Sequence, residues 1–189
     1  MSKGYSYLFS GTLGSSYLND PSKEESYSDR GIEIPKRIRK VLSKLKEKGD
    51  HIVCSPDAFD MKDVSIMSKE TGVEFAKVTI GDKSYLIRGD GRGTYIPDDL
   101  LKEIRVNGGT LDFHSHPRGD DLVPSQSDMR MMKVLLKATG QRSSSIVTTN
   151  GQIAHFDKDG VISVEAVKNK LDKSYRKALN KLFGGERHD

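Results

Sequence analysis

Residues 111–128 have the sequence LDFHSHPRGDDLVPSQSD, the most informative pattern in the chain. On a β-strand, side chains two positions apart point to the same face, so His114 and His116 present two imidazoles side by side. A proline ends the strand, a loop follows, and Ser125 lies where the N-cap of a helix belongs. Asp128 then falls in the first helical turn and can point back toward the end of the strand.

Two histidines and one aspartate form a possible set of metal ligands. A zinc ion with three protein ligands keeps a fourth position for water, which is typical of catalytic sites. Each part also has a structural explanation: a His-x-His pair is often an ordinary pair of strand side chains, and Ser125-x-x-Asp128 alone is a capping box. Because the spacing brings both parts to one strand end, we predict one Zn²⁺ per chain, bound by His114, His116 and Asp128.

At these positions the chain resembles the JAMM (MPN+/JAB) metalloprotease superfamily. The family pattern is a remote glutamate, His-x-His-Pro, seven residues counted from that proline, and Ser-x-x-Asp. The matching residues are His114, His116, Pro117, Ser125 and Asp128, and the surrounding sequence is most similar to the RadC-like and prokaryotic JAB branches. Eight residues, 117–124, precede Ser125 here, and we interpret the extra one as an insertion in the loop 120–123.

The resemblance also implies roles for residues outside the metal ligands. The family glutamate opens a strand, and Glu74 fits because an apolar run ending at Gly81 follows it. Glu70 is the alternative general base, since the sequence 70–72 is similar to the start of this motif in other prokaryotic members. Ser125 would donate a hydrogen bond to the oxyanion of a hydrolysed amide. The implied fold is a JAMM/cytidine-deaminase-like three-layer sandwich with a mixed sheet flanked by helices.

Length and composition limit the class of protein. The 189 residues suit one domain, and 31 basic against 27 acidic residues give a net charge of only +4, so any nucleic-acid contact must be local. The single cysteine, Cys54, excludes an internal disulfide and a cysteine-based zinc finger. Without a signal peptide or a run of about 18 apolar residues, we expect a cytoplasmic protein with no membrane span.

Hydrophobic periodicity and turn residues predict the elements along the chain. We expect helices over 34–48, between 58 and 72, and over 97–106, 125–138 and 164–183. Predicted strands cover 73–80, 83–88, 91–96, 110–116, 143–149 and 152–156. Strands and helices mix without strict alternation, which is typical of an α+β fold or a three-layer α/β sandwich.

The same patterns divide the chain into three parts. Residues 1–31 form a loosely ordered arm rich in Ser, Gly and Tyr, residues 32–160 form the JAMM-like domain, and residues 161–189 form a basic C-terminal helix and tail. We interpret Asp120 and Asp121 as a solvated turn. We interpret His155 as an ordinary sheet residue.

Three functions are compatible with these residues. The first is a zinc-dependent metallopeptidase or isopeptidase that hydrolyses a peptide or isopeptide bond, with the substrate held as an extended strand at the sheet edge near His116. The second is a RadC-like nucleic-acid-associated module that uses the basic side chains of helices 36–48 and 168–181. The third is a non-catalytic MPN scaffold, although such domains lose ligands that this chain retains. The sequence indicates no oligomeric state.

Overall fold

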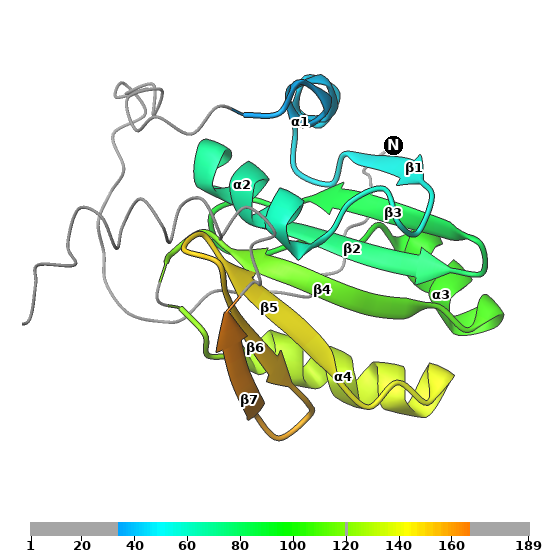
Figure 1. The fold of residues 1–189 in the computed structure, drawn as a ribbon. Helices are drawn as coiled ribbons and strands as arrows, with labels where there is room; N and C mark the ends of the chain where they lie inside the picture. The colour runs from blue at the N-terminus through cyan, green and yellow to red at the C-terminus, as the bar shows by residue number, and fades with distance from the viewer. Residues whose placement is uncertain (1–33, 120, 167–189) are drawn as a thin grey trace, which may run out of the picture.

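The structure is a computed structural model that describes residues 34–119 and 121–166 (Figure 1). Over these residues the chain forms a seven-stranded mixed sheet and four helices, so the expected α+β class is confirmed. The elements in chain order are α1 (Lys36–Leu42), β1 (His51–Cys54), α2 (Met61–Thr71), β2 (Phe75–Ile80), β3 (Lys83–Arg88), α3 (Asp98–Asn107), β4 (Thr110–His116), α4 (Gln126–Thr139), β5 (Ser144–Thr148), β6 (Gln152–Phe156) and β7 (Val161–Ala166).

The histidine strand β4 lies in the interior of the sheet. The strand order is β1-β3-β2-β4-β5-β6-β7, and only the β4–β5 pair is parallel. Ala76 of β2 lies opposite His114, and Thr148 of β5 lies beside His116. Both edges of β4 are therefore occupied, and its two histidines are buried.

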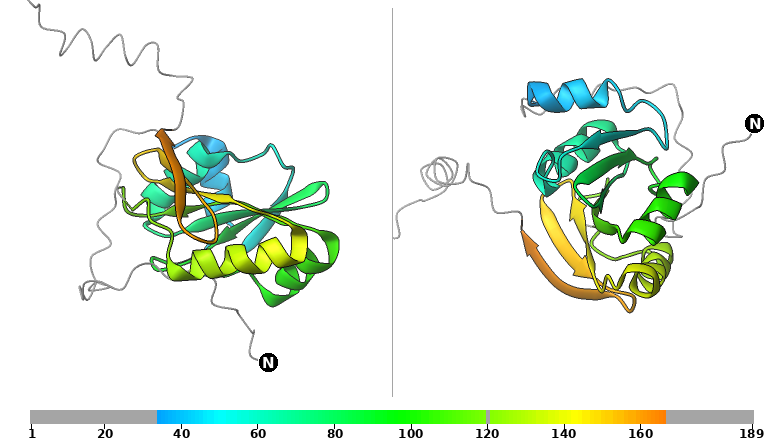
Figure 2. Two further views of the ribbon diagram at one scale, coloured as in Figure 1. Left: turned by 90° about the horizontal axis from the view of Figure 1, so that it is seen from below. Right: turned by 90° about the vertical axis from the view of Figure 1, so that its right-hand side faces the viewer.

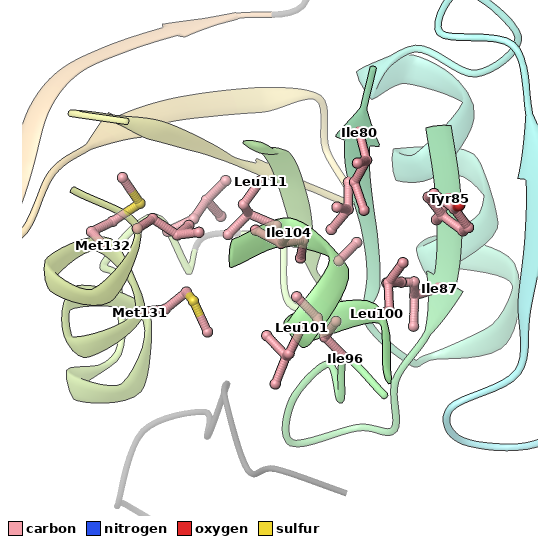
Figure 3. Close-up of a cluster of buried hydrophobic side chains, with 14 of the residues drawn as sticks. Ile80, Tyr85, Ile87, Ile96, Leu100, Leu101, Ile104, Leu111, Met131 and Met132 are labelled. Atoms are coloured by element: carbon pink, nitrogen blue, oxygen red, sulfur yellow. The ribbon is translucent and has the colours of Figure 1, made fainter. Parts of the chain in front are cut away.

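Helices cover both faces of the sheet, which gives three layers (Figure 2). On one face, α3 and α4 pack Ile104 and Met132 against strand residues such as Leu111 (Figure 3). On the other face, α1 and α2 pack Ile38 and Met67 against a second apolar cluster. The sheet is therefore shielded on both sides where β4 crosses it.

The helix α4 begins where the sequence predicts. Its N-cap is Ser125, whose side chain accepts a hydrogen bond from the backbone N–H of Asp128, while the Asp128 side chain accepts one from the Ser125 N–H. This reciprocal capping box satisfies two backbone donors at the helix start. Ser125 and Asp128 therefore occupy the expected positions even with eight residues in the preceding loop.

Most other predicted elements are confirmed within two residues at each end: β2, β3, α3, β4, β5 and β6; α2 lies within the predicted range 58–72. The predicted helix 34–48 is too long, because α1 ends at Leu42. The Asp50 carboxylate accepts hydrogen bonds from the backbone N–H groups of Lys46 and Glu47, and the Arg88 side chain donates to the carbonyl of Leu45. These contacts occupy backbone N–H and C=O groups that would otherwise form the hydrogen bonds of a longer helix.

Two further differences concern short strands. No strand was predicted at residues 51–54, but they form the edge strand β1 against β3. Residues 91–96 were expected to form a strand, but they contribute only an isolated bridge between Asp90 and Gly93. The Asp90 side chain accepts hydrogen bonds from the N–H groups of Arg92 and Gly93, which folds this segment into a turn.

The C-terminal boundary also differs from the prediction. Residues 161–166 form the strand β7 rather than the start of a basic helix, so the sheet extends past the expected limit at residue 160. The Asp157 carboxylate accepts hydrogen bonds from the N–H groups of Asp159 and Gly160, which closes a tight turn and brings β7 back beside β6. The predicted arm 1–31 and the rest of the basic helix and tail, 167–189, lie outside the described residues.

No helix in the described part of the chain is both long and apolar enough to cross a bilayer. This finding agrees with the absence of a long apolar run in the sequence.

The core beneath the histidines gives a stability prediction. Phe156 is fully buried, and its ring meets the His114 ring edge-on with centroids 5.7 Å apart. Phe156→Ala should lower the free energy of unfolding by about 3–5 kcal/mol, measured by urea denaturation without metal. Val106→Ala is the control, because Val106 is 72% exposed and its truncation should change stability by less than about 0.5 kcal/mol. Equal effects of the two substitutions would contradict the described core.

Candidate metal centre

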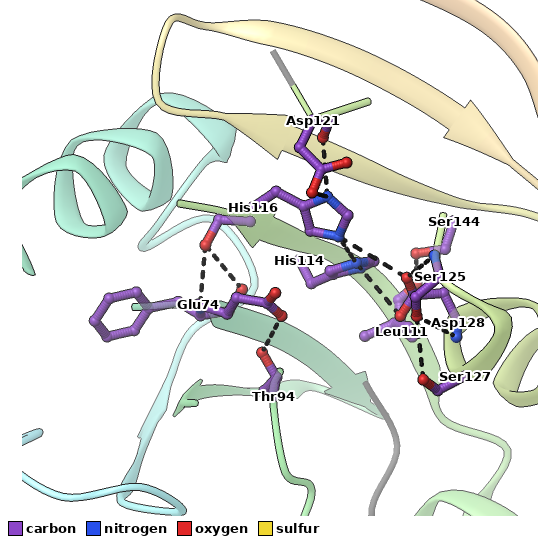
Figure 4. Close-up of polar contacts among 12 residues, drawn as sticks. Glu74, Thr94, Leu111, His114, His116, Asp121, Ser125, Ser127, Asp128 and Ser144 are labelled. Carbon is purple, nitrogen blue, oxygen red and sulfur yellow. Dashed lines mark hydrogen bonds and ion pairs between the residues drawn. The ribbon is translucent and has the colours of Figure 1, made fainter. Parts of the chain in front are cut away.

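Three buried side chains converge at the carboxyl end of β4 (Figure 4). The Nε2 atoms of His114 and His116 lie 3.2 Å apart. Asp128 completes the group from the first turn of α4, with Oδ1 3.6 Å from Nε2 of His114 and Oδ2 3.9 Å from Nε2 of His116. The structure therefore brings together the three residues that the sequence predicts as ligands.

These separations can be compared with the geometry that a tetrahedral metal requires. Ligand bonds of about 2.0–2.1 Å at a tetrahedral angle place neighbouring ligand atoms about 3.3 Å apart. The 3.2 Å between the two Nε2 atoms and the 3.6 Å from Oδ1 of Asp128 to Nε2 of His114 lie close to that value, whereas the 3.9 Å contact with His116 is made by the other oxygen, Oδ2. A divalent ion thus fits between the side chains with small adjustments.

The hydrogen bonds of His116 leave its Nε2 available as a ligand. Its Nδ1 lies 2.9 Å from the backbone carbonyl oxygen of Asp121, which can only accept a hydrogen bond, so Nδ1 is the donor. In the neutral imidazole the lone pair is then on Nε2, facing His114 and Asp128. Metal-ligating histidines commonly use such a second hydrogen bond to fix their tautomer and ring orientation.

Asp128 has one oxygen in the helix cap and one that faces the histidines. Its Oδ2 accepts the N–H of Ser125 at 2.6 Å. Its Oδ1 is buried and lies 3.6 Å from Nε2 of His114, and no donor in the described residues reaches it within 3.5 Å. A buried carboxylate oxygen without a donor is costly unless a cation satisfies it. The donor set and this oxygen together suit a metal ion.

The acidic surroundings also stabilise positive charge at this position. Burial by itself would lower the pKa of His116. The hydrogen bond to Asp121 and the carboxylates of Glu74 and Asp128 outweigh burial and raise the pKa of His116 to about 9. In the metal-free protein a proton on His116 supplies the positive charge, and a metal ion would displace that proton.

Glu74 lies beside this group, just before the first residue of β2. The antiparallel β2–β4 register, with Ala76 opposite His114, brings the start of β2 next to the end of β4. Glu74 is 2% exposed, and burial raises its pKa from 4.5 to about 8. Such a carboxyl group can both accept and release a proton near neutral pH.

Glu70, the alternative general base, lies in the last turn of α2 and is exposed. The structure therefore brings Glu74, and not Glu70, to the three candidate ligands. Gly72 ends α2 between the two glutamates in a left-handed conformation, with φ of 66°. This turn separates the helix position of Glu70 from the strand position of Glu74.

Ser125 lies at the edge of the group and is nearly buried. Its Oγ accepts the N–H of Asp128 at 3.2 Å and lies 3.1 Å from the Oγ of Ser127. The hydroxyl hydrogen can rotate, so Ser125 can donate to a neighbouring acceptor while its oxygen caps the helix.

Sequence reasoning missed two residues that contact the site. Asp121 was interpreted as part of a solvated turn, but its carbonyl holds His116, and its carboxylate lies 3.5 Å from Nδ1 of the same ring. Thr94 lies in the segment 91–96, which was wrongly predicted as a strand. Its hydroxyl donates a hydrogen bond to Oε2 of Glu74, with 3.5 Å between the two oxygens. Two aspartates, 120 and 121, close to the histidines in the sequence could have indicated that Asp121 contacts the site. No feature of the sequence around Thr94 indicates that it contacts Glu74.

The edge-strand binding mode expected for the substrate does not fit the topology. β4 lies between β2 and β5, and the edge strands of the described sheet are β1 and β7. His155 is an ordinary sheet residue, as expected. Its ring nitrogens form hydrogen bonds with the side chains of Ser145 and Glu165.

Comparisons with protein-family models, curated proteins and solved structures find no match to this chain. The resemblance to the JAMM superfamily therefore depends on the motif residues alone.

The convergence of ligands predicts metal binding. Purified protein should bind one divalent transition-metal ion per chain, and His116→Ala and Asp128→Ala should each lose most of it, as measured by elemental analysis after dialysis. The ion should also raise the unfolding temperature of the wild type, because it binds only the folded ligand set. His155→Ala is the matched control and should retain the ion. Unchanged metal content in both ligand variants would place the ion elsewhere.

The raised pKa of Glu74 predicts a pH dependence of stability in the presence of a chelator. Between pH 4.5 and 8 the folded state keeps a proton on Glu74 that the unfolded chain releases, so this group makes stability fall as pH rises. Glu74→Gln removes the effect. Its stability relative to wild type should increase with pH across this window, by at most about 1.4 kcal/mol per pH unit. A stability profile of Glu74→Gln that runs parallel to the wild-type profile across this pH range would contradict the assignment.

Proposed function

We propose that this protein is a zinc-dependent metallopeptidase or isopeptidase of the JAMM type. One observation carries the proposal: a buried His-His-Asp group lies beside a buried glutamate whose pKa is about 8. A closed structural zinc site would need a fourth protein ligand, whereas three ligands leave a position for water or substrate. Two imidazole nitrogens and one carboxylate oxygen also suit Zn²⁺ in their chemistry.

The architecture supports the same proposal. A mixed sheet between two pairs of helices is compatible with a JAMM/cytidine-deaminase-like three-layer sandwich. The family motif would then be distributed as the resemblance implies, with the glutamate before β2, the two histidines at the end of β4, and the Ser-x-x-Asp at the start of α4.

In the proposed mechanism, zinc held by His114, His116 and Asp128 would act as a Lewis acid that polarises the carbonyl and lowers the pKa of water from about 15.7 to about 7. Glu74 accepts the proton that the attacking water loses and passes it to the nitrogen of the leaving amine. A C–O bond forms, the C–N bond breaks, and Glu74 returns to its starting state. Proton transfer by a positioned side chain typically contributes about 10²–10⁴-fold to the rate.

Ser125 has the second catalytic role in this proposal. Its hydroxyl donates a hydrogen bond to the oxyanion that develops on the carbonyl oxygen, which is worth about 3 kcal/mol in comparable sites. The capping box fixes the Ser125 oxygen against the N–H of Asp128, so the donor is held in place before substrate binds. The substrate class is a peptide bond or an isopeptide bond to lysine in a partner protein.

Two alternative functions remain as proposals of lower rank. A nucleic-acid module is favoured by α1, which exposes Lys36, Arg39 and Lys40 and has no acidic residue in its first turn. However, α1 has only seven residues, and residues 44–48 of the predicted basic helix follow its end. A non-catalytic scaffold has less support, because every residue of the motif is present.

The proposal predicts that Glu74→Gln retains zinc and loses hydrolysis. The substitution removes the proton acceptor without touching a ligand, so turnover of a peptide or isopeptide substrate by zinc-loaded protein should fall about 10²–10⁴-fold. Glu70→Gln should remain as active as wild type. An active Glu74→Gln together with an inactive Glu70→Gln would reverse the assignment of the base.

The zinc-loaded Glu74→Gln variant can also be used to trap the substrate. Capture of a protein that the wild type then cleaves would support the peptidase. Recovery of nucleic acid alone, with salt-sensitive affinity and no cleavable protein, would favour the nucleic-acid module.

A further inference from the structure

We infer that the segment 89–95, called here the glycine loop, is a positioning element for the Glu74 carboxylate, with Thr94 as the positioning residue. The inference rests on the proposed function, because it assigns a role in orienting the proposed general base. Neither the motif residues nor the sequence pattern assigns any role to this segment, which connects β3 to α3.

The glycine loop first fixes the backbone of Glu74. The N–H of Gly89 donates to the carbonyl of Glu74 at 2.7 Å, and the N–H of Glu74 donates to the carbonyl of Asp90 at 3.0 Å. Glu74 precedes β2 and is outside its regular ladder, so these two hydrogen bonds replace the strand pairing that it lacks. The loop therefore fixes the backbone position from which the Glu74 side chain extends.

Asp90 holds the loop in its tight conformation. Its Oδ1 accepts the N–H groups of Arg92 and Gly93 at 2.8 and 3.1 Å, and its own N–H donates to the Gly93 carbonyl at 2.9 Å. Its Oδ2 lies 3.2 Å from Nζ of Lys48, which also lies over the Tyr95 ring, 3.3 Å from its centroid. The loop is thus fastened to the segment that follows α1.

The close approach of the loop's two ends requires glycine. A Cβ atom at Gly89 would lie 2.2 Å from the carbonyl oxygen of Gly93 and 2.8 Å from Cα of Thr94. Both distances are far below van der Waals contact, and the clashing atoms belong to the backbone. The absence of a side chain at Gly89 is what allows Thr94 to approach Glu74.

Thr94 then contacts the carboxylate itself. Its hydroxyl donates to Oε2 of Glu74 at 3.5 Å, and both side chains are buried (Figure 4). A long contact of this kind in a metal-free site can tighten when substrate binds. A donor to one carboxylate oxygen limits rotation of the group and leaves Oε1 to exchange the proton with water and the leaving amine.

The test compares three variants loaded with zinc. Thr94→Val keeps the shape and removes the hydroxyl, so kcat should fall about tenfold or more while KM stays within about twofold and zinc content is unchanged. Thr94→Ser restores the donor and should recover most of kcat. Thr110→Val, at the opposite end of β4, is the matched control and should retain wild-type kcat. An unchanged kcat in Thr94→Val would overturn the inference.

A second measurement does not depend on hydrolysis. In metal-free protein at one pH, the carboxyl ¹³C resonance of Glu74, assigned by its loss in Glu74→Gln, should shift in Thr94→Val and stay in place in Thr110→Val. If the zinc-loaded wild type hydrolyses nothing, the proposed peptidase fails, and this resonance still decides whether Thr94 holds the carboxylate. No shift in Thr94→Val would overturn the positioning role whatever the activity.

Discussion

The reciprocal hydrogen bonds between Ser125 and Asp128 are the interaction on which the rest of the site depends. They begin α4, and they also fix the Asp128 carboxylate with one oxygen in the cap and the other toward His114. A capping box alone is a common device for starting a helix. Here Asp128 is also a candidate metal ligand and Ser125 is also a candidate oxyanion donor. A substitution at either residue would therefore alter both the start of the helix and the chemistry of the site.

Burial gives this site its chemical character. His114, His116, Asp128 and Glu74 are all buried, so their charges have little water to stabilise them and respond strongly to one another. The pKa of Glu74 is raised chiefly by burial, whereas the pKa of His116 is raised by the carboxylates around it. A cation among the three ligands would neutralise part of this negative charge. Metal binding and folding stability should therefore be coupled.

The topology gathers the site from three distant segments. The start of β2 and the end of β4 become neighbours because the two strands are antiparallel, while the parallel β4–β5 pair keeps β4 in the interior of the sheet. The glycine loop closes on Glu74 from one side, and Asp121 holds His116 from the other. The glycine loop and Asp121 therefore contact the buried site from different segments of the chain.

Local patterns were enough to predict β4, the cap of α4 and the three candidate ligands, because strand alternation and capping act over only a few residues. Glu74 was preferred to Glu70 only because its sequence context resembles the family motif; the difference in burial between these two glutamates became visible only in the fold. Local patterns also missed β1 and β7, whose pairing depends on other strands, and the contacts of Thr94 and Asp121. Thr94 lies 20 residues from Glu74 in the chain, so only the folded sheet brings its hydroxyl to the buried carboxylate.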